Sequence, residues 1–203
     1  MRNLAAGKIV APQTFAQLVS LACHDLRTPL ATASGFARTL QRLDDIGQPG
    51  GRYAEMIGAA ADQMAELLDL LSAAARVEDD RFEPQLRPTN ARDLAETAAS
   101  RLPEGSTSVA GEGSAVDVDP TWAAVSLSAL AEAARRHGGL EQIALAVDGS
   151  AVEISPIVDG VGEIATGDNL RDFAAAVGVR VLDAAGATVE LDGDRLRVRF
   201  PEP

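Results

Sequence analysis

Two stretches between residues 12 and 77 carry apolar side chains at steps of three or four positions, which is the spacing of one face of an α-helix. In the first stretch the recurring apolar residues are Phe15, Leu18, Ala22, Leu26, Leu30, Ala33, Phe36, Leu40 and Leu43. In the second stretch they are Tyr53, Met56, Ile57, Ala60, Met64, Leu67, Leu68 and Leu71. The segment Asp45–Gly51 between them is rich in helix-breaking residues. The pattern therefore predicts an antiparallel helical hairpin.

Each apolar stripe is too wide for one partner helix to cover, and two helices alone bury little surface. We therefore expect two hairpins to associate as a homodimer with a four-helix bundle. Residues 1–11 are interpreted as a tail, 12–77 as the hairpin domain and 78–90, which contain Pro84 and Pro88, as a linker.

The pattern changes character over residues 91–203. Helices are expected over residues 91–102 with Asn90 as N-cap, from Asp119-Pro120 to about His137, and over 170–185. Extended segments are expected over 107–118, 142–147, 152–158, 188–191 and 196–200, the later ones joined by Asp-Gly turns. The fold class is therefore α+β: a helical hairpin followed by a small sandwich of helices on one sheet.

Composition and charge narrow the classes of function. Hydrophobic residues make up 46% of the 203-residue chain, which suffices for a buried core. Residues 1–77 hold seven basic and seven acidic residues, so the whole net charge of −12 lies in residues 78–203. Such an acidic surface repels phosphate backbones and argues against nucleic-acid binding. The single cysteine excludes an internal disulfide and a four-cysteine zinc site.

No stretch of the sequence predicts membrane insertion. The longest run without a charged residue, residues 9–23, contains Pro12 and several polar residues and is too polar to span a bilayer. The N-terminus lacks the apolar core of a signal peptide. We therefore expect a cytoplasmic protein without membrane contact.

The segment Cys23–Leu30 carries the candidate chemistry. At about 100° per residue, His24 lies about 200° from Ala22 on the helix, away from the apolar stripe. Thr28 lies on the same outer face, and Asp25 borders it. An exposed imidazole can act as a nucleophile, a carboxylate beside it can hold the proton of the other ring nitrogen, and a hydroxyl one turn away can orient water.

The string His24-Asp-Leu-Arg-Thr-Pro-Leu30 closely resembles the phosphoacceptor box of two-component sensor histidine kinases. The resemblance extends over about residues 12–77. It implies a dimerisation and histidine-phosphotransfer domain in which His24 is phosphorylated and Asp25 assists proton transfer. It also implies that Thr28 positions water in a phosphatase reaction and that Arg27 holds a supporting position of the motif.

Residues 91–203 resemble the ATP-binding domain of the same family in layout but depart from it in site residues. Ala133 stands at the position of the metal-binding asparagine, and the glycines of Asp159–Gly162 are one position out of register. Asp172 and Ala174 stand where the family has phosphate-cradling glycines, and an aspartate there places negative charge against a phosphate. Only about ten residues lie between Asp159 and Asn169, which is too few for the mobile lid that covers ATP in the family. We therefore expect this module not to bind ATP in the family's way.

Three interpretations follow. In the first, the chain is a dimeric histidine phosphotransferase that carries a phosphoryl group on His24 to or from the aspartates of response-regulator receiver domains and also dephosphorylates a regulator. It then needs no cofactor of its own, and Mg²⁺ is expected on the regulator. In the second, it is a soluble kinase that phosphorylates His24 with Mg-ATP. In the third, it is a non-catalytic dimer that sequesters regulators.

Overall fold

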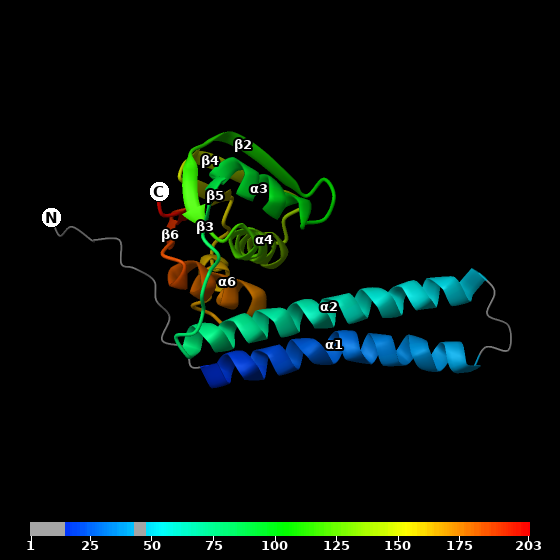
Figure 1. Ribbon diagram of the computed structural model, residues 1–203. Helices are drawn as coiled ribbons and strands as arrows, with labels where there is room; N and C mark the ends of the chain where they lie inside the picture. Colours follow the sequence, from blue (N-terminus) through cyan, green and yellow to red (C-terminus); the bar gives the residue numbers. More distant parts are fainter. Residues whose placement is uncertain (1–14, 43–47) are drawn as a thin grey trace. The chain divides into compact units, whose positions relative to one another are not determined.

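The computed structural model describes residues 15–42 and 48–203. The chain divides into two compact units, one with the helical hairpin as far as Ser72 and one with Ala73–Pro203. Figure 1 shows both units. The tail expected over residues 1–11 and the expected core residue Leu43 lie outside the described residues. Within the described part of the chain, no helix has both the length and the apolar character that a membrane span requires.

The hairpin is made of two long antiparallel helices, α1 (Phe15–Arg42) and α2 (Gln48–Glu78) (Figure 1). Helix α2 begins earlier than predicted, because Gly50 and Gly51 belong to its first turn rather than to the connection. Proline and glycine are tolerated in a first turn, where the backbone N–H groups have no helical partner. The expected helical hairpin is therefore confirmed, with a shorter connection than the sequence indicated.

The apolar stripes of the hairpin are only partly buried. Leu18, Ala22 and Ala60 are buried as predicted, whereas Leu30 and Leu68 are each 55% exposed. Both leucines belong to the predicted stripes, which were expected to need more cover than one partner helix gives. Two helices cover only one side of each other, and a wide stripe keeps its margin exposed.

The second unit contains seven strands, which form two sheets. They are β1 (Arg87–Asn90), β2 (Thr107–Gly113), β3 (Ala115–Val118), β4 (Ile143–Gly149), β5 (Ala151–Ser155), β6 (Thr188–Asp192) and β7 (Arg195–Arg199). Strands β1 and β3 form an antiparallel pair, and the other five form a sheet in the order β2-β4-β5-β7-β6. Strand β2 runs parallel to β4, and the remaining pairs are antiparallel.

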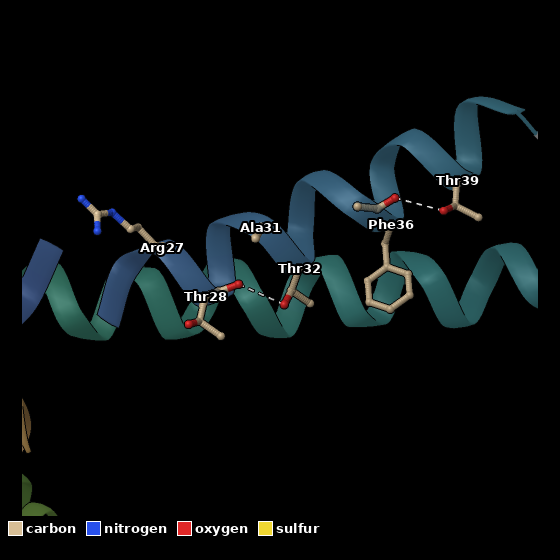
Figure 2. A pocket seen from close by; sticks show the side chains of 7 residues that line it. Arg27, Thr28, Ala31, Thr32, Phe36 and Thr39 are labelled. Atoms are coloured by element: carbon tan, nitrogen blue, oxygen red, sulfur yellow. Dashed lines mark hydrogen bonds between the residues drawn. The ribbon is translucent and has the colours of Figure 1, made fainter. Parts of the chain in front are cut away.

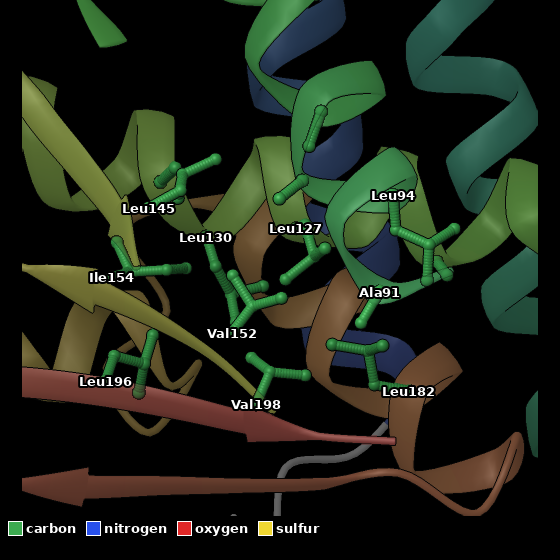
Figure 3. Close-up of a cluster of buried hydrophobic side chains, with 14 of the residues drawn as sticks. Ala91, Leu94, Leu127, Leu130, Leu145, Val152, Ile154, Leu182, Leu196 and Val198 are labelled. Carbon is green, nitrogen blue, oxygen red and sulfur yellow. The ribbon is translucent and has the colours of Figure 1, made fainter. Parts of the chain in front are cut away.

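Four helices accompany these strands: α3 (Ala91–Ser100), α4 (Pro120–His137), α5 (Gly162–Ala165) and α6 (Phe173–Ala184). Alternate residues of the central strands, such as Val152 and Ile154 of β5, point toward the helices (Figure 3). They meet Leu127 and Leu130 of α4 and Leu182 of α6, all of which are nearly inaccessible to solvent. The predicted α+β sandwich, with helices packed on a sheet, is therefore confirmed.

The helix starts in this unit follow from capping side chains. Asn90 caps α3 by accepting from the N–H of Arg92 over 2.8 Å, and Asp119 caps α4 by accepting from Thr121 and Trp122. The third cap differs from the sequence prediction, because α6 begins at Phe173 and not at residue 170. Asp172 accepts from the N–H of Ala175 over 3.1 Å and thereby fixes the first turn.

Candidate functional site

The predicted site residues all lie on α1 between residues 24 and 28. His24, Arg27 and Thr28 are exposed, and Asp25 is half-buried. The exposure of His24 agrees with helical geometry, since the buried residues Leu18 and Ala22 define the opposite side. One turn of helix separates His24 from Thr28, so both side chains are accessible from the same side.

Pro29 lies inside α1, directly after this group. Its ring provides no N–H to the helical ladder and is buried, unlike the exposed side chains on either side of it, Thr28 and Leu30. A proline inside a helix is an identifiable cause of bending. The chain therefore places a local irregularity of the backbone within two turns of the candidate nucleophile.

A shallow hollow of about 690 Å³ runs along α1 from Arg27 to Thr39. Its other lining residues are Thr28, Ala31, Thr32, Gly35 and Phe36, most of which have small side chains (Figure 2). The hydroxyl groups of Thr32 and Thr39 each donate to the backbone carbonyl four residues earlier, both over 3.0 Å. Their methyl groups are therefore the parts left to line the hollow. The hollow was not predicted from the sequence, because it depends on small side chains at several positions of α1, namely 28, 31, 32, 35 and 39.

Two residues of the second unit bear on whether it can hold a nucleotide. The side chain of Ala133 is fully buried and has no oxygen or nitrogen with which to hold a metal ion. Asp172 is also buried, and its carboxylate occupies the start of α6. These residues do not fit Mg-ATP, since a triphosphate at this helix start meets a fixed negative charge.

A cluster of charged side chains surrounds Asp172 and was not predicted from the sequence. Arg136 Nη2 donates to Asp172 Oδ2 over 2.6 Å, and His137 Nε2 lies 3.2 Å from the same oxygen. The neighbouring Arg135 takes no part in it, because a hydrogen bond with Glu132 holds that guanidinium on its own helix and raises its pKa. The basic run Arg135–His137 was the visible signal, but the carboxylate that pairs with it lies 35 positions away from His137.

Among the residues that the structure describes, no three or more His, Cys, Asp and Glu side chains are grouped as metal ligands. His24 and Cys23, although adjacent, are both exposed and leave α1 about 100° apart.

Comparisons with known proteins agree with this geometry. Residues 16–80 match the family model of the His Kinase A (phospho-acceptor) domain. The sensor protein DivL of Caulobacter vibrioides is 30% identical over 78 residues, which are 38% of this chain and 10% of that protein. The chain thus corresponds to a small part of this relative.

Solved structures show the same fold over most of the chain. A histidine kinase of Acinetobacter baumannii, AdeS, aligns with a TM-score of 0.63 and 16% identity, covering 88% of this chain and 97% of that one. Full-length ShkA, solved in complex with AMPPNP, aligns with a TM-score of 0.54 and 20% identity over 94% of this chain and 45% of that one. The resemblance to two-component sensor histidine kinases, predicted from the sequence, is confirmed.

Proposed function

We propose that this chain is a histidine phosphotransferase of a two-component phosphorelay, with His24 as the phosphoryl carrier. The observation that carries the proposal is the exposed imidazole of His24, one turn before an open hollow, inside a region that matches a phospho-acceptor domain. The donors and acceptors of the phosphoryl group are aspartates of response-regulator receiver domains.

The transfer reaction needs a nucleophile, a group that stabilises a proton and a positive charge beside the phosphoryl oxygens. One ring nitrogen of His24 attacks phosphorus, the N–P bond forms, and the P–O bond to the regulator's aspartate breaks, which leaves a free carboxylate. The proton on the other ring nitrogen is stabilised by a neighbouring carboxylate, the role assigned to Asp25. Arg27 supplies a positive charge beside the incoming phosphoryl oxygens.

Thr28 is assigned to the hydrolytic reaction on the same face. Its side chain is exposed one turn from His24, so its hydroxyl can accept from or donate to a water that attacks the regulator's phosphoaspartate. Orienting one water is a positioning effect, which affects hydrolysis and leaves direct transfer to the imidazole unchanged.

The hollow beside His24 is the proposed docking surface for the receiver domain. Small and methyl-bearing side chains line it from Thr28 to Thr39, which allows a helix of the partner to approach α1 closely. Because this surface begins one turn after His24, a partner docked on it has its aspartate near the imidazole.

A homodimer is proposed from the exposed margin of the hairpin. Leu30, Leu68 and Met56 are exposed by 55%, 55% and 37%, although they belong to the apolar stripes. Two such hairpins can cover these margins mutually as a four-helix bundle. Dimerisation thus accounts for apolar surface that one hairpin leaves in water.

An ATP-dependent kinase that phosphorylates its own His24 is the second candidate. The fold shared with AdeS and ShkA favours it, because the latter was solved with an ATP analogue. The buried Ala133 and the carboxylate of Asp172 disfavour it, since neither holds a metal-bound triphosphate. We therefore place phosphotransfer first.

The two candidates separate in one experiment. The full chain is incubated either with ³²P-labelled ATP and Mg²⁺ or with receiver domains that carry labelled phosphoaspartate, and acid-labile phosphohistidine is measured. Label from the receivers and none from ATP is expected. Label from ATP would replace the proposal by the kinase, and regulator binding without any label would leave a sequestering protein.

The His24→Gln variant is the matched control, because His137 is the only other histidine of the chain and stays in place. Loss of all label in this variant is expected. Label that persists in His24→Gln would show that the phosphoryl group resides elsewhere and would overturn the assignment of His24.

A further inference from the structure

Strand β6 lies at one edge of the five-stranded sheet, where it pairs with β7 alone. The two strands are joined by the two-residue turn Gly193-Asp194, so Asp192 and Arg195 form the hydrogen-bonded pair that closes the hairpin. Hydrogen-bonded and non-hydrogen-bonded pairs alternate along an antiparallel ladder. The backbone N–H and C=O groups of Val189 and Leu191 therefore point away from β7.

This outer edge of β6 has no backbone partner among residues 15–42 and 48–203, since none of their hydrogen bonds outside helices and strands involves residues 188–192. An unpaired strand edge is a template for another extended chain, and proteins often blunt it with proline, lysine or a bulge. Residues 188–192 contain neither proline nor lysine, and their register with β7 is unbroken. The edge can therefore accept a further strand.

The side chains of β6 alternate between the two faces of the sheet. Val189 and Leu191 face the core but are only half-buried, because they lie at the margin of the sheet. Thr188, Glu190 and Asp192 face the other side and are exposed. A strand added at this edge would meet apolar side chains on one face and acidic side chains on the other.

The carboxylates of Glu190 and Asp192 form no ion pair with any side chain that the structure describes. Their cross-strand neighbours on β7 are Arg197 and Arg195. Both guanidinium groups turn to the other side of β7 and donate to carboxylates of β4 and β5, over 3.1 Å and 3.2 Å. The outer edge of β6 therefore carries two negative charges that its own sheet does not neutralise.

We propose that the outer edge of β6 is a docking site for an extended segment of another protein in which basic and apolar residues alternate. Strand β7, with the sequence Arg195-Leu-Arg-Val-Arg199, shows that this pattern fits, because it faces the same side chains of β6 across the ladder. Opposite charges and apolar pairs across neighbouring strands are stabilising. The net negative charge of residues 78–203 also attracts a basic segment.

A second copy of this chain does not fit the same edge. Two β6 strands paired edge to edge, with their apolar residues on the core side, place Thr188, Glu190 or Asp192 opposite one another. Like charges directly opposite each other in a sheet are destabilising. The acidic residues therefore oppose self-association and favour a basic partner. Because the inference concerns only the α/β unit, it stands or falls separately from phosphotransfer at His24.

A peptide that copies residues 195–200 is the probe, and the full chain is titrated with it in a calorimeter. Saturable binding is expected, at least about tenfold tighter than that of the same peptide with glutamate in place of each arginine. Binding should slow hydrogen exchange of the Val189 and Leu191 amides by at least about tenfold, because both then donate to the peptide backbone. Lack of saturable binding, equal affinities for the two peptides, or unprotected amides at these positions would overturn the proposal.

The double variant Glu190→Gln with Asp192→Asn removes both charges and should weaken peptide binding by at least about tenfold. Glu104→Gln with Glu112→Gln is the matched control, since it changes the net charge equally at exposed positions away from β6. The control should bind like the wild type. Equal weakening of both double variants would indicate attraction to an acidic surface in general and would contradict docking at β6.

Val189→Pro tests the backbone contribution, because proline is tolerated on an edge strand where the N–H faces solvent. It should abolish peptide binding while the circular dichroism spectrum stays native, and binding that survives in the folded variant would overturn the proposal. If Val189→Pro does not fold, the charge variants and the amide exchange of the wild type decide. Self-association of the wild-type chain that Val189→Pro reverses in ultracentrifugation would assign the edge to a second copy instead.

Discussion

The ring of Phe36 on α1 stacks on the ring of Tyr53 on α2, with the ring centroids 5.4 Å apart and the ring planes 23° apart. Phe36 is also one of the residues that line the hollow on α1 (Figure 2). The same side chain therefore joins the two helices of the hairpin and forms part of the proposed docking surface. The stack holds the Phe36 ring in place. The depth of the hollow therefore depends on the neighbouring lining residue, Gly35, which has no side chain.

The first prediction concerns Gly35, whose added Cβ would meet nothing within 4 Å. Gly35→Leu is expected to stabilise α1 by about 0.8 kcal/mol through helix propensity and to fill the hollow. Receiver-domain binding, measured by titration calorimetry, should weaken by at least about tenfold. Gly58→Leu on α2 is the control, since Gly58 is equally open, and it should gain stability without losing affinity. Equal affinities of both variants would contradict docking at the hollow.

The second prediction concerns Thr28. Thr28→Ala is expected to slow hydrolysis of the receiver's phosphoaspartate by about 10²-fold, because the water loses its orienting hydroxyl. Phosphotransfer to His24 should stay within about threefold of the wild-type rate, since transfer uses no water. Both rates are measured on the same labelled receiver. Thr28→Ser, which restores the hydroxyl, should recover hydrolysis, and an inactive Thr28→Ser protein would argue against this role.

The third prediction concerns the exposed leucine of α1. Leu30→Glu is expected to raise the dimer dissociation constant by at least about 10²-fold, because two symmetry-related side chains lose about 1.5–3 kcal/mol each of apolar burial. Analytical ultracentrifugation measures the change. Gln63→Glu adds the same charge at an exposed position of α2 and should leave the dimer intact. A dimer that tolerates Leu30→Glu would show that this margin is not the interface.

The fourth prediction concerns Asp119, which is 7% exposed and accepts hydrogen bonds from three backbone N–H groups: those of Thr121, Trp122 and Gln85. Asp119→Ala is expected to lower the free energy of unfolding of the α/β unit by about 2 kcal/mol, since the start of α4 loses its cap and Gln85 loses its acceptor.

Fluorescence of Trp122, the single tryptophan of the chain, follows this unfolding in urea because its ring packs edge-to-face on Phe82. Asp119→Asn retains the capping oxygen and should lower the free energy of unfolding by less than Asp119→Ala does. If both variants lower it equally, the effect is due to the charge of Asp119.

Much of the hairpin and of the candidate site is determined by the sequence alone. Within one helix the relative directions of His24, Thr28 and Ala31 follow from the 3.6-residue period, so their common outer face requires no knowledge of the fold. The caps Asn90 and Asp119 act on backbone groups two or three residues away, which is also local information. Hydrophobic periodicity and capping are short-range properties that the order of residues carries directly.

Only the tertiary structure decided which distant groups meet. It placed Arg136 and His137 on the carboxylate of Asp172, set the strand order β2-β4-β5-β7-β6, and determined that Leu30 is 55% exposed on a single hairpin. Each of these depends on how elements pack together, and packing is selected by the burial of the whole core, not by any single segment. The sequence therefore determined the elements and the outward direction of His24, whereas the assembled fold decided that the start of α6 is already occupied by a charge of its own.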